Sequence, residues 1–95
     1  MDPMVWVGKW IDVWRVCREK CSDEECKHDC DEKYGVIAVL EHDSADGVYT
    51  DMLLNLRDLH SYISSISPVE TFDYIPDEYV IIIGKRGTLL LKRGI

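Results

Sequence analysis

Apolar residues among the first twenty positions recur at spacings of three and four, which predicts an amphipathic helix over residues 3–21. Asp2 before Pro3 is a suitable N-cap followed by proline at the first helical position. Gly8 costs about 1 kcal/mol inside a helix, so a short strand at Met4–Val7 is an open alternative. The apolar face of the helix would carry Met4, Trp6, Val7, Trp10, Ile11, Val13, Trp14, Cys17 and Cys21.

The three tryptophans form a narrow stripe on this face, because residues four apart lie on one side of a helix. Such a stripe is more often core than binding site, although tryptophan is enriched in interface hot spots. Trp14 lies near the second helix described next and is expected to be buried in the monomer. Trp6 and Trp10 lie beyond that helix and are expected to pack on a sheet or on another chain, which makes them candidate interface residues.

Residues 22–33 predict a second, short helix. Ser22 followed by Glu25 forms a capping box at its start, and Gly35 is placed to end it. The apolar residues of this segment are its two cysteines, so the helix has no apolar face that burial could hold. A helix this short is marginal in water. The cysteines are therefore expected to tie it to the first helix.

Four cysteines follow the pattern C-x3-C-x4-C-x3-C from Cys17 to Cys30. Two helices joined by so short a turn are antiparallel neighbours, in which Cys21 faces Cys26 and Cys17 faces Cys30. Four cysteines allow three pairings, and this nested pairing fits the hairpin best. A zinc site made by four thiolates, or four free thiols, are the alternatives that the residues leave open. We expect the nested disulfides and no bound metal.

The twin C-x3-C pairs resemble the helical hairpins of plant α-hairpinin peptides and of the small chaperones of the mitochondrial intermembrane space. The resemblance covers residues 17–30, and the four-residue spacing between the pairs matches the plant peptides better. It implies a stapled helical hairpin and carries no implication about activity.

The downstream half contains β-branched runs and one amphipathic helix. A loop is predicted at residues 43–47, and a helix capped by Thr50 is predicted to run to Ile66. Strands are predicted at Val36–Leu40, at Val69–Ile75 as an edge strand, and at Tyr79–Ile83 and Thr88–Leu91 as a hairpin around Gly84-Lys85-Arg86-Gly87.

These elements predict an α+β fold in a single domain, residues 1–95. A disulfide-stapled N-terminal helical hairpin (1–34) would pack with a strand–helix–β-hairpin half (35–95), giving a three- to four-stranded, mainly antiparallel sheet and one long amphipathic helix. Consecutive apolar residues in the last two strands mean that both of their faces need cover. The 50–66 helix is expected to cover one face, and the tryptophan stripe the other, unless a second subunit supplies that cover.

The formal net charge of −7 works against binding to nucleic acid or anionic membranes, because long-range repulsion opposes both. Residues 22–51 carry ten acids and two lysines, whereas residues 84–95 carry four cations and no acid. We interpret these as two solvated surfaces that attract each other within the fold. No apolar run approaches the roughly 20 residues of a membrane span, and the first residues lack the pattern of a secretory signal.

Disulfides without an export signal are common in the cytosol of hyperthermophiles. High isoleucine, valine and glutamate content and the absence of glutamine are compatible with such an origin and with a thermostable protein, encoded by the host or by its virus. The other expected location is a different oxidising compartment, reached without a cleaved signal.

The sequence contains no glycine-rich phosphate loop, H-E-x-x-H, G-x-S-x-G or C-x-x-C motif, and its histidines are scattered. We therefore expect a non-enzymatic interaction protein without a cofactor, acting on a protein partner or as a homodimer. The first alternative is a nucleic-acid-binding module that uses a basic β-hairpin, with Lys85, Arg86, Lys92 and Arg93 as contacts. The second is a small enzyme that uses Glu41, His42 or His60.

Overall fold

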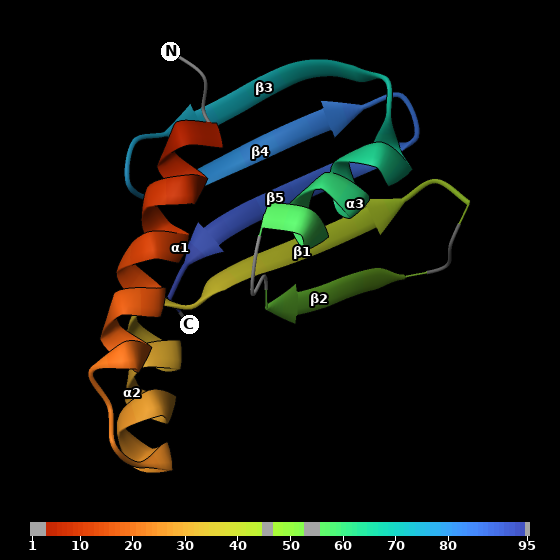
Figure 1. Ribbon diagram of the computed structural model, residues 1–95. Coiled ribbons are helices and arrows are strands. Elements are labelled where there is room, and N and C mark those ends of the chain that lie inside the picture. The colour runs from red at the N-terminus through yellow and green to blue at the C-terminus, as the bar shows by residue number, and fades with distance from the viewer. Residues whose placement is uncertain (1–3, 45–46, 53–55, 95) are drawn as a thin grey trace.

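The computed structural model describes residues 4–44, 47–52 and 56–94, which form an α+β fold with a stapled N-terminal helical hairpin (Figure 1). The helix expected at the N-terminus begins at Met4, so the alternative of a strand before Gly8 is wrong. The elements are α1 (Met4–Glu19), α2 (Glu24–Tyr34), β1 (Val36–His42), β2 (Val48–Met52), α3 (Leu56–Ile66), β3 (Val69–Ile75), β4 (Tyr79–Gly84) and β5 (Gly87–Arg93).

The strands form one antiparallel sheet of five strands in the order β2-β1-β5-β4-β3. The predicted hairpin of β4 and β5 is confirmed, with Gly84 paired to Gly87 around a two-residue loop. A Cβ on Gly84 would clash with the carbonyl oxygen of Ile66, so glycine lets the end of α3 approach the hairpin closely. The predicted edge strand at Val69–Ile75 is also confirmed, as β3.

Two expectations for the downstream half are wrong in detail. The sheet has five strands rather than three or four, because β2 adds an edge strand beside β1. The helix expected from Thr50 begins at Leu56 instead, since Thr50 pairs with Val39 in the sheet. Residues 53–55, which the expected helix includes, lie outside the described residues. Strand pairing thus overrides a helical pattern that extended into β2.

The core lies between one face of the sheet and two helices (Figure 1). Figure 1 shows α1 crossing the strand ends and α3 lying over the middle of the sheet, both on the same side. The expectation that the tryptophan helix covers the opposite face from α3 is therefore wrong. The buried residues of this core are Val7, Trp10, Ile11, Trp14, Cys30, Val36, Ala38, Leu40, Leu59, Ile66, Val80, Ile82, Leu89 and Leu91.

Candidate functional site

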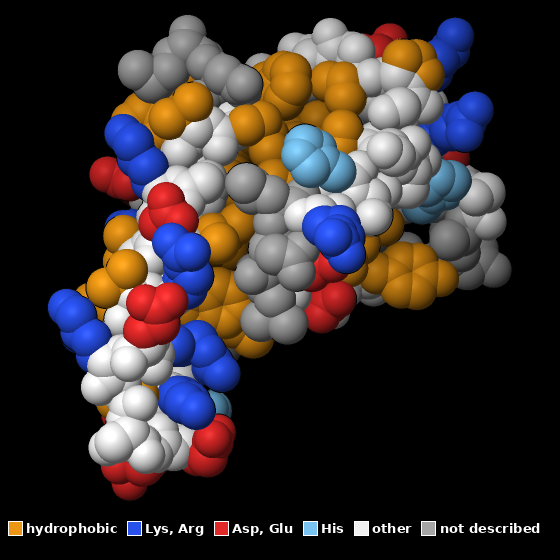
Figure 2. Space-filling view, in the orientation of Figure 1, with side chains coloured by type: hydrophobic (Ala, Val, Ile, Leu, Met, Phe, Trp, Pro, Cys, Tyr) orange, Lys and Arg blue, Asp and Glu red, His pale blue; other side chains and the backbone are white. Residues whose placement is uncertain are grey.

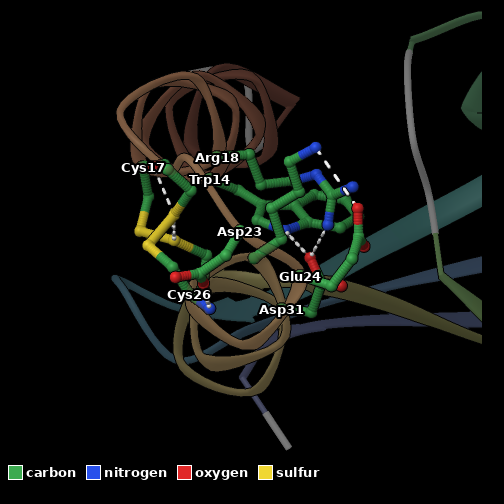
Figure 3. Close-up of a disulfide and its surroundings, with 10 residues drawn as sticks. Trp14, Cys17, Arg18, Asp23, Glu24, Cys26 and Asp31 are labelled. Atoms are coloured by element: carbon green, nitrogen blue, oxygen red, sulfur yellow. Dashed lines mark hydrogen bonds and ion pairs between the residues drawn. A yellow bond between two sulfur atoms is a disulfide. The ribbon is translucent and has the colours of Figure 1, made fainter.

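Two disulfides staple α1 to α2, and they are the nested pair expected from the sequence. Cys17 is bonded to Cys30 and Cys21 to Cys26, with Cα atoms 5.9 Å and 5.5 Å apart (Figure 3). The bridges lie close together, since the sulfur of Cys21 is 3.6 Å from that of Cys30. In this state the sulfurs form S–S bonds rather than the thiolates that zinc binds.

The second helix begins one residue later than expected. Asp23 rather than Ser22 is the N-cap, and its carboxylate accepts a hydrogen bond from the backbone N–H of Cys26 at 2.7 Å. Gly35 ends the helix as predicted, and its backbone N–H donates to the carbonyl of Asp31. The short helix is therefore capped at both ends, which reduces its dependence on the bridges.

Asp31 is a further tie between α1 and α2 that the sequence reading missed. Its Oδ1 accepts hydrogen bonds from Trp14 Nε1 at 2.7 Å and from the guanidinium of Arg18 at 2.5 Å (Figure 3). Burial raises the pKa of Asp31, but the hydrogen bonds from Arg18 and Trp14 outweigh it, so the net pKa lies below its ordinary value. The sequence did contain a signal for this contact, because the predicted Cys17–Cys30 bridge places Trp14 beside the residues that follow Cys30.

The tryptophan stripe lies mainly in the core of the monomer. Trp14 is 3% exposed and Trp10 is 1% exposed, and Trp10 Nε1 donates to Asp77 Oδ1 at 3.3 Å in the β3–β4 turn. Trp6 is partly exposed, with the ammonium of Lys9 over its ring. Of the two interface candidates, Trp6 alone therefore retains appreciable surface for a partner.

The four candidate nucleic-acid contacts are divided between the two ends of β5. Lys85 and Arg86 form the β4–β5 loop, whereas Lys92 and Arg93 end the strand, about 17 Å away at 3.4 Å per residue. Lys92 and Arg93 also point to opposite faces of the sheet, because they are consecutive strand residues. These cations do not converge on one surface.

The structure places the three candidate enzymatic residues in different surroundings. Glu41 and His42 are consecutive in β1 and face opposite sides of the sheet. His42 Nδ1 accepts from the backbone N–H of Ser44 at 3.1 Å, and its Nε2 donates to the carbonyl of Ser65 at 2.8 Å. Both ring nitrogens are thus used in holding the loop after β1 against α3. His60 is exposed on α3.

The hairpin surface carries charges of both signs, which Figure 2 shows as mixed red and blue side chains along α1 and α2. A hollow of about 290 Å³ is lined by Trp14, Arg15, Arg18 and Lys27, among others. Its three cations are already paired with acids: Arg15 with Asp12, Arg18 with Asp31 and Lys27 with Glu24. An anionic ligand would have to compete with these pairs.

The face of the sheet opposite the helices is a further apolar surface of the described residues, and α1 also exposes Val5, Val13 and Val16. Its strand residues are absent from the core that α1 and α3 complete. We name this surface the open sheet face. By alternation along the paired strands, it comprises Ile37, Val39, Glu41, Val48, Thr50, Thr71, Asp73, Ile75, Tyr79, Ile81, Ile83, Thr88, Leu90 and Lys92. Ile37 is the buried member of this face, and Met52, which pairs with Ile37, packs against the core instead.

The centre of the open sheet face is apolar and its margin is mixed. Val39, Leu90 and Ile81 lie side by side on β1, β5 and β4, and each is partly exposed. Beside them, a shallow hollow of about 330 Å³ is lined by Glu78, Tyr79, Ile81, Leu90 and Lys92. An apolar centre with charged groups around it is the composition of a protein interface.

Comparison with protein-family models, curated proteins and solved structures finds no match to this chain. Among the described residues, no helix combines the length and apolarity needed to cross a bilayer.

Proposed function

We propose that the protein is a non-enzymatic interaction module that docks another protein chain on the open sheet face. The observation that supports this is the row of Val39, Leu90 and Ile81, which no described helix covers. Monomeric proteins rarely leave a wide contiguous apolar surface in contact with water. A docked chain would remove that surface from solvent, at about 25 cal/mol for each Å² buried.

This proposal keeps the class of function that the sequence suggested and changes the surface that carries it. Trp10 packs in the monomer core, so its indole contributes to stability rather than to contact with a partner. Trp6 lies on the helix side of the molecule, near the N-terminal end of α1. The apolar residues best placed for docking are on the other side of the sheet.

The two alternative functions gain less support from the geometry. A nucleic-acid-binding module needs cations that track a phosphate backbone, whereas Lys85 and Lys92 lie at opposite ends of a strand. A small enzyme needs acid and base groups within hydrogen-bond reach of one substrate. Glu41 and His42 point to opposite sides of the sheet.

The two disulfides are compatible with an oxidising compartment. Among the compartments where disulfides persist, we propose the cytosol of a hyperthermophile, with the gene belonging to the host or to its virus. The support is the absence of glutamine and the richness in isoleucine, valine and glutamate. A thermal midpoint above about 90 °C is expected, and a midpoint in the mesophilic range of about 45–65 °C would contradict this origin.

The docking proposal is tested with a photoreactive phenylalanine analogue at two positions of equal exposure. Ile83 lies on the open sheet face and Tyr74 on the helix side, and each is 38% exposed. Irradiation of the purified protein, alone and in extract of its native cells, should give a protein adduct at position 83. The adduct should disappear when unlabelled wild-type protein competes. Equal labelling at both positions, or none at either, would overturn the proposal.

A further inference from the structure

We infer that the occupant of the open sheet face is a second copy of this chain, packed face to face about a two-fold axis. This inference rests on the proposed function and names its partner. The axis lies between the two sheets and runs across the strands, along the row of Val39, Leu90 and Ile81. Each of these side chains then packs against the same residue of the other copy, as a symmetric interface requires.

Two charged residues favour this orientation of the two-fold axis over one that runs along the strands. Lys92 lies at one end of the open sheet face, in the row with Ile37 and Tyr79, and Glu41 lies at the other end, paired with Thr88. Within one chain they are about 14 Å apart along the strands at 3.4 Å per residue. Neither takes part in an ion pair in the described part of the chain.

The proposed two-fold axis exchanges the two ends of the face. Glu41 and Lys92 lie on neighbouring strands, so the rotation brings Lys92 of each copy beside Glu41 of the other. Two symmetric ion pairs then flank the apolar row. A two-fold axis along the strands would instead superpose the two copies of Lys92, which repel each other.

The size of the face reaches the lower bound for a specific dimer interface. Five strands about 4.8 Å apart and six residues of about 3.4 Å give roughly 480 Å² per copy. Two copies then contribute about 1,000 Å² of flat area, which is the lower bound for a specific interface. The uneven surface of the side chains makes the buried area larger than this flat value. Packed sheets are about 10 Å apart and rotated by about 30°, so the corners diverge. Asp73, on the edge strand β3, pairs with Ile81 and lies in the same row, so the axis places the two copies of Asp73 opposite each other at its outer end. Asp73 is exposed there, and solvent and salt screen this repulsion.

The net charge of the chain does not prevent this association. Six of its acids lie within residues 23–32, in the turn before α2 and in α2 itself. Figure 1 shows that α2 extends past the end of the sheet, away from its centre. Repulsion between these acidic segments is screened beyond about 8 Å at physiological ionic strength.

The test is a charge swap read by analytical ultracentrifugation of the oxidised full chain. The wild type should sediment as a dimer, and Glu41→Lys and Lys92→Glu should each weaken the dimer at least about tenfold by placing like charges together. The double variant restores opposite charges and should recover an affinity close to that of the wild type. Lys85→Glu, in the β4–β5 loop, is the matched control and should leave the dimer unchanged.

Thermal melting of each variant checks that the monomer fold is intact. A wild-type protein that is monomeric at about 100 µM, a concentration that detects even weak affinity, would overturn the inference. The inference would also be overturned if both single variants weaken the dimer and the double variant does not restore it. A dimer whose affinity is unchanged in Glu41→Lys, Lys92→Glu and the double variant would overturn it as well. If the protein is monomeric but position 83 still gives an adduct with another protein, the second copy is wrong and the proposed function stands.

Discussion

The indole Nε1 of Trp14 donates a hydrogen bond to Oδ1 of Asp31 over 2.7 Å, and this contact joins α1 to α2 independently of the disulfides. The same oxygen is paired with Arg18, so one carboxylate serves two donors from the first helix. A buried indole N–H needs an acceptor, and Asp31 supplies one at the junction of the hairpin and the core.

Asp31→Asn should destabilise the protein by about 1 kcal/mol at neutral pH, since an amide oxygen still accepts from Trp14 but loses the charge that attracts Arg18. The effect is modest because the Asp31 side chain is 25% exposed, so water screens its attraction to Arg18. Folding lowers the pKa of Asp31 from 3.8, so its contribution is present above that pH and is lost as pH falls through the lower folded pKa.

Urea unfolding of wild type and Asp31→Asn from pH 7 to pH 2 measures this contribution. The difference in unfolding free energy should shrink toward zero below the folded pKa. Asp29→Asn, exposed on the same helix, controls for the removal of one negative charge. A pH-independent difference between wild type and Asp31→Asn would show that the carboxylate charge has no part in stability.

The oxidised protein should show a mass four hydrogens below that of the reduced chain, with peptides linking Cys17 to Cys30 and Cys21 to Cys26. Non-reducing mass spectrometry of the purified protein measures both quantities. Four alkylatable thiols, or zinc bound in a one-to-one ratio, would contradict this prediction.

Removal of the outer bridge should open α2 before the rest of the molecule. In the chain-entropy model, a 14-residue loop closed by a disulfide contributes about 3 kcal/mol. Without it, α2 keeps its inner bridge, the contacts of Asp31 and the packing of Tyr34 against the core. Hydrogen exchange on Cys17→Ser/Cys30→Ser should therefore show loss of protection first in residues 24–34. Cys21→Ser/Cys26→Ser, which opens a shorter loop, should have the smaller effect. Uniform loss of protection across the sheet would count against this order.

The sequence predicted those elements whose patterns are local. The C-x3-C spacing fixed the register of the bridges, and glycines around Lys85 and Arg86 marked the β4–β5 hairpin. The strand at Val48–Met52 was missed, because Met52 continues the helical spacing of α3 and nothing local shows that β1 needs a partner on that edge. A run of isoleucines in β4 signals that both faces are apolar, but not which helix covers each face.

Local patterns also failed to predict the surroundings of the candidate site residues. Trp6 and Trp10 looked equivalent on a helical stripe, yet Trp10 is buried and donates to Asp77 in the β3–β4 turn, whereas Trp6 is partly exposed. Asp77, with which Trp10 pairs, is 67 residues away in the chain and has a positive φ of 62° in that turn. Contacts this distant depend on the assembled sheet, and the open sheet face itself exists only once both helices have packed on the other side.

Trp10→Ala should destabilise the protein by about 3–5 kcal/mol, because a fully buried indole leaves a cavity when it is truncated. Trp6→Ala should cost clearly less, since Trp6 is partly exposed and its removal leaves an indentation that water can fill. Urea unfolding of the two variants measures both costs. Sedimentation of folded Trp10→Ala should show self-association like that of the wild type, because Trp10 lies on the helix side of the sheet. A Trp10→Ala protein that keeps the wild-type midpoint but loses its dimer or partner would instead make the tryptophan stripe the interface, and would move the docking surface away from the open sheet face.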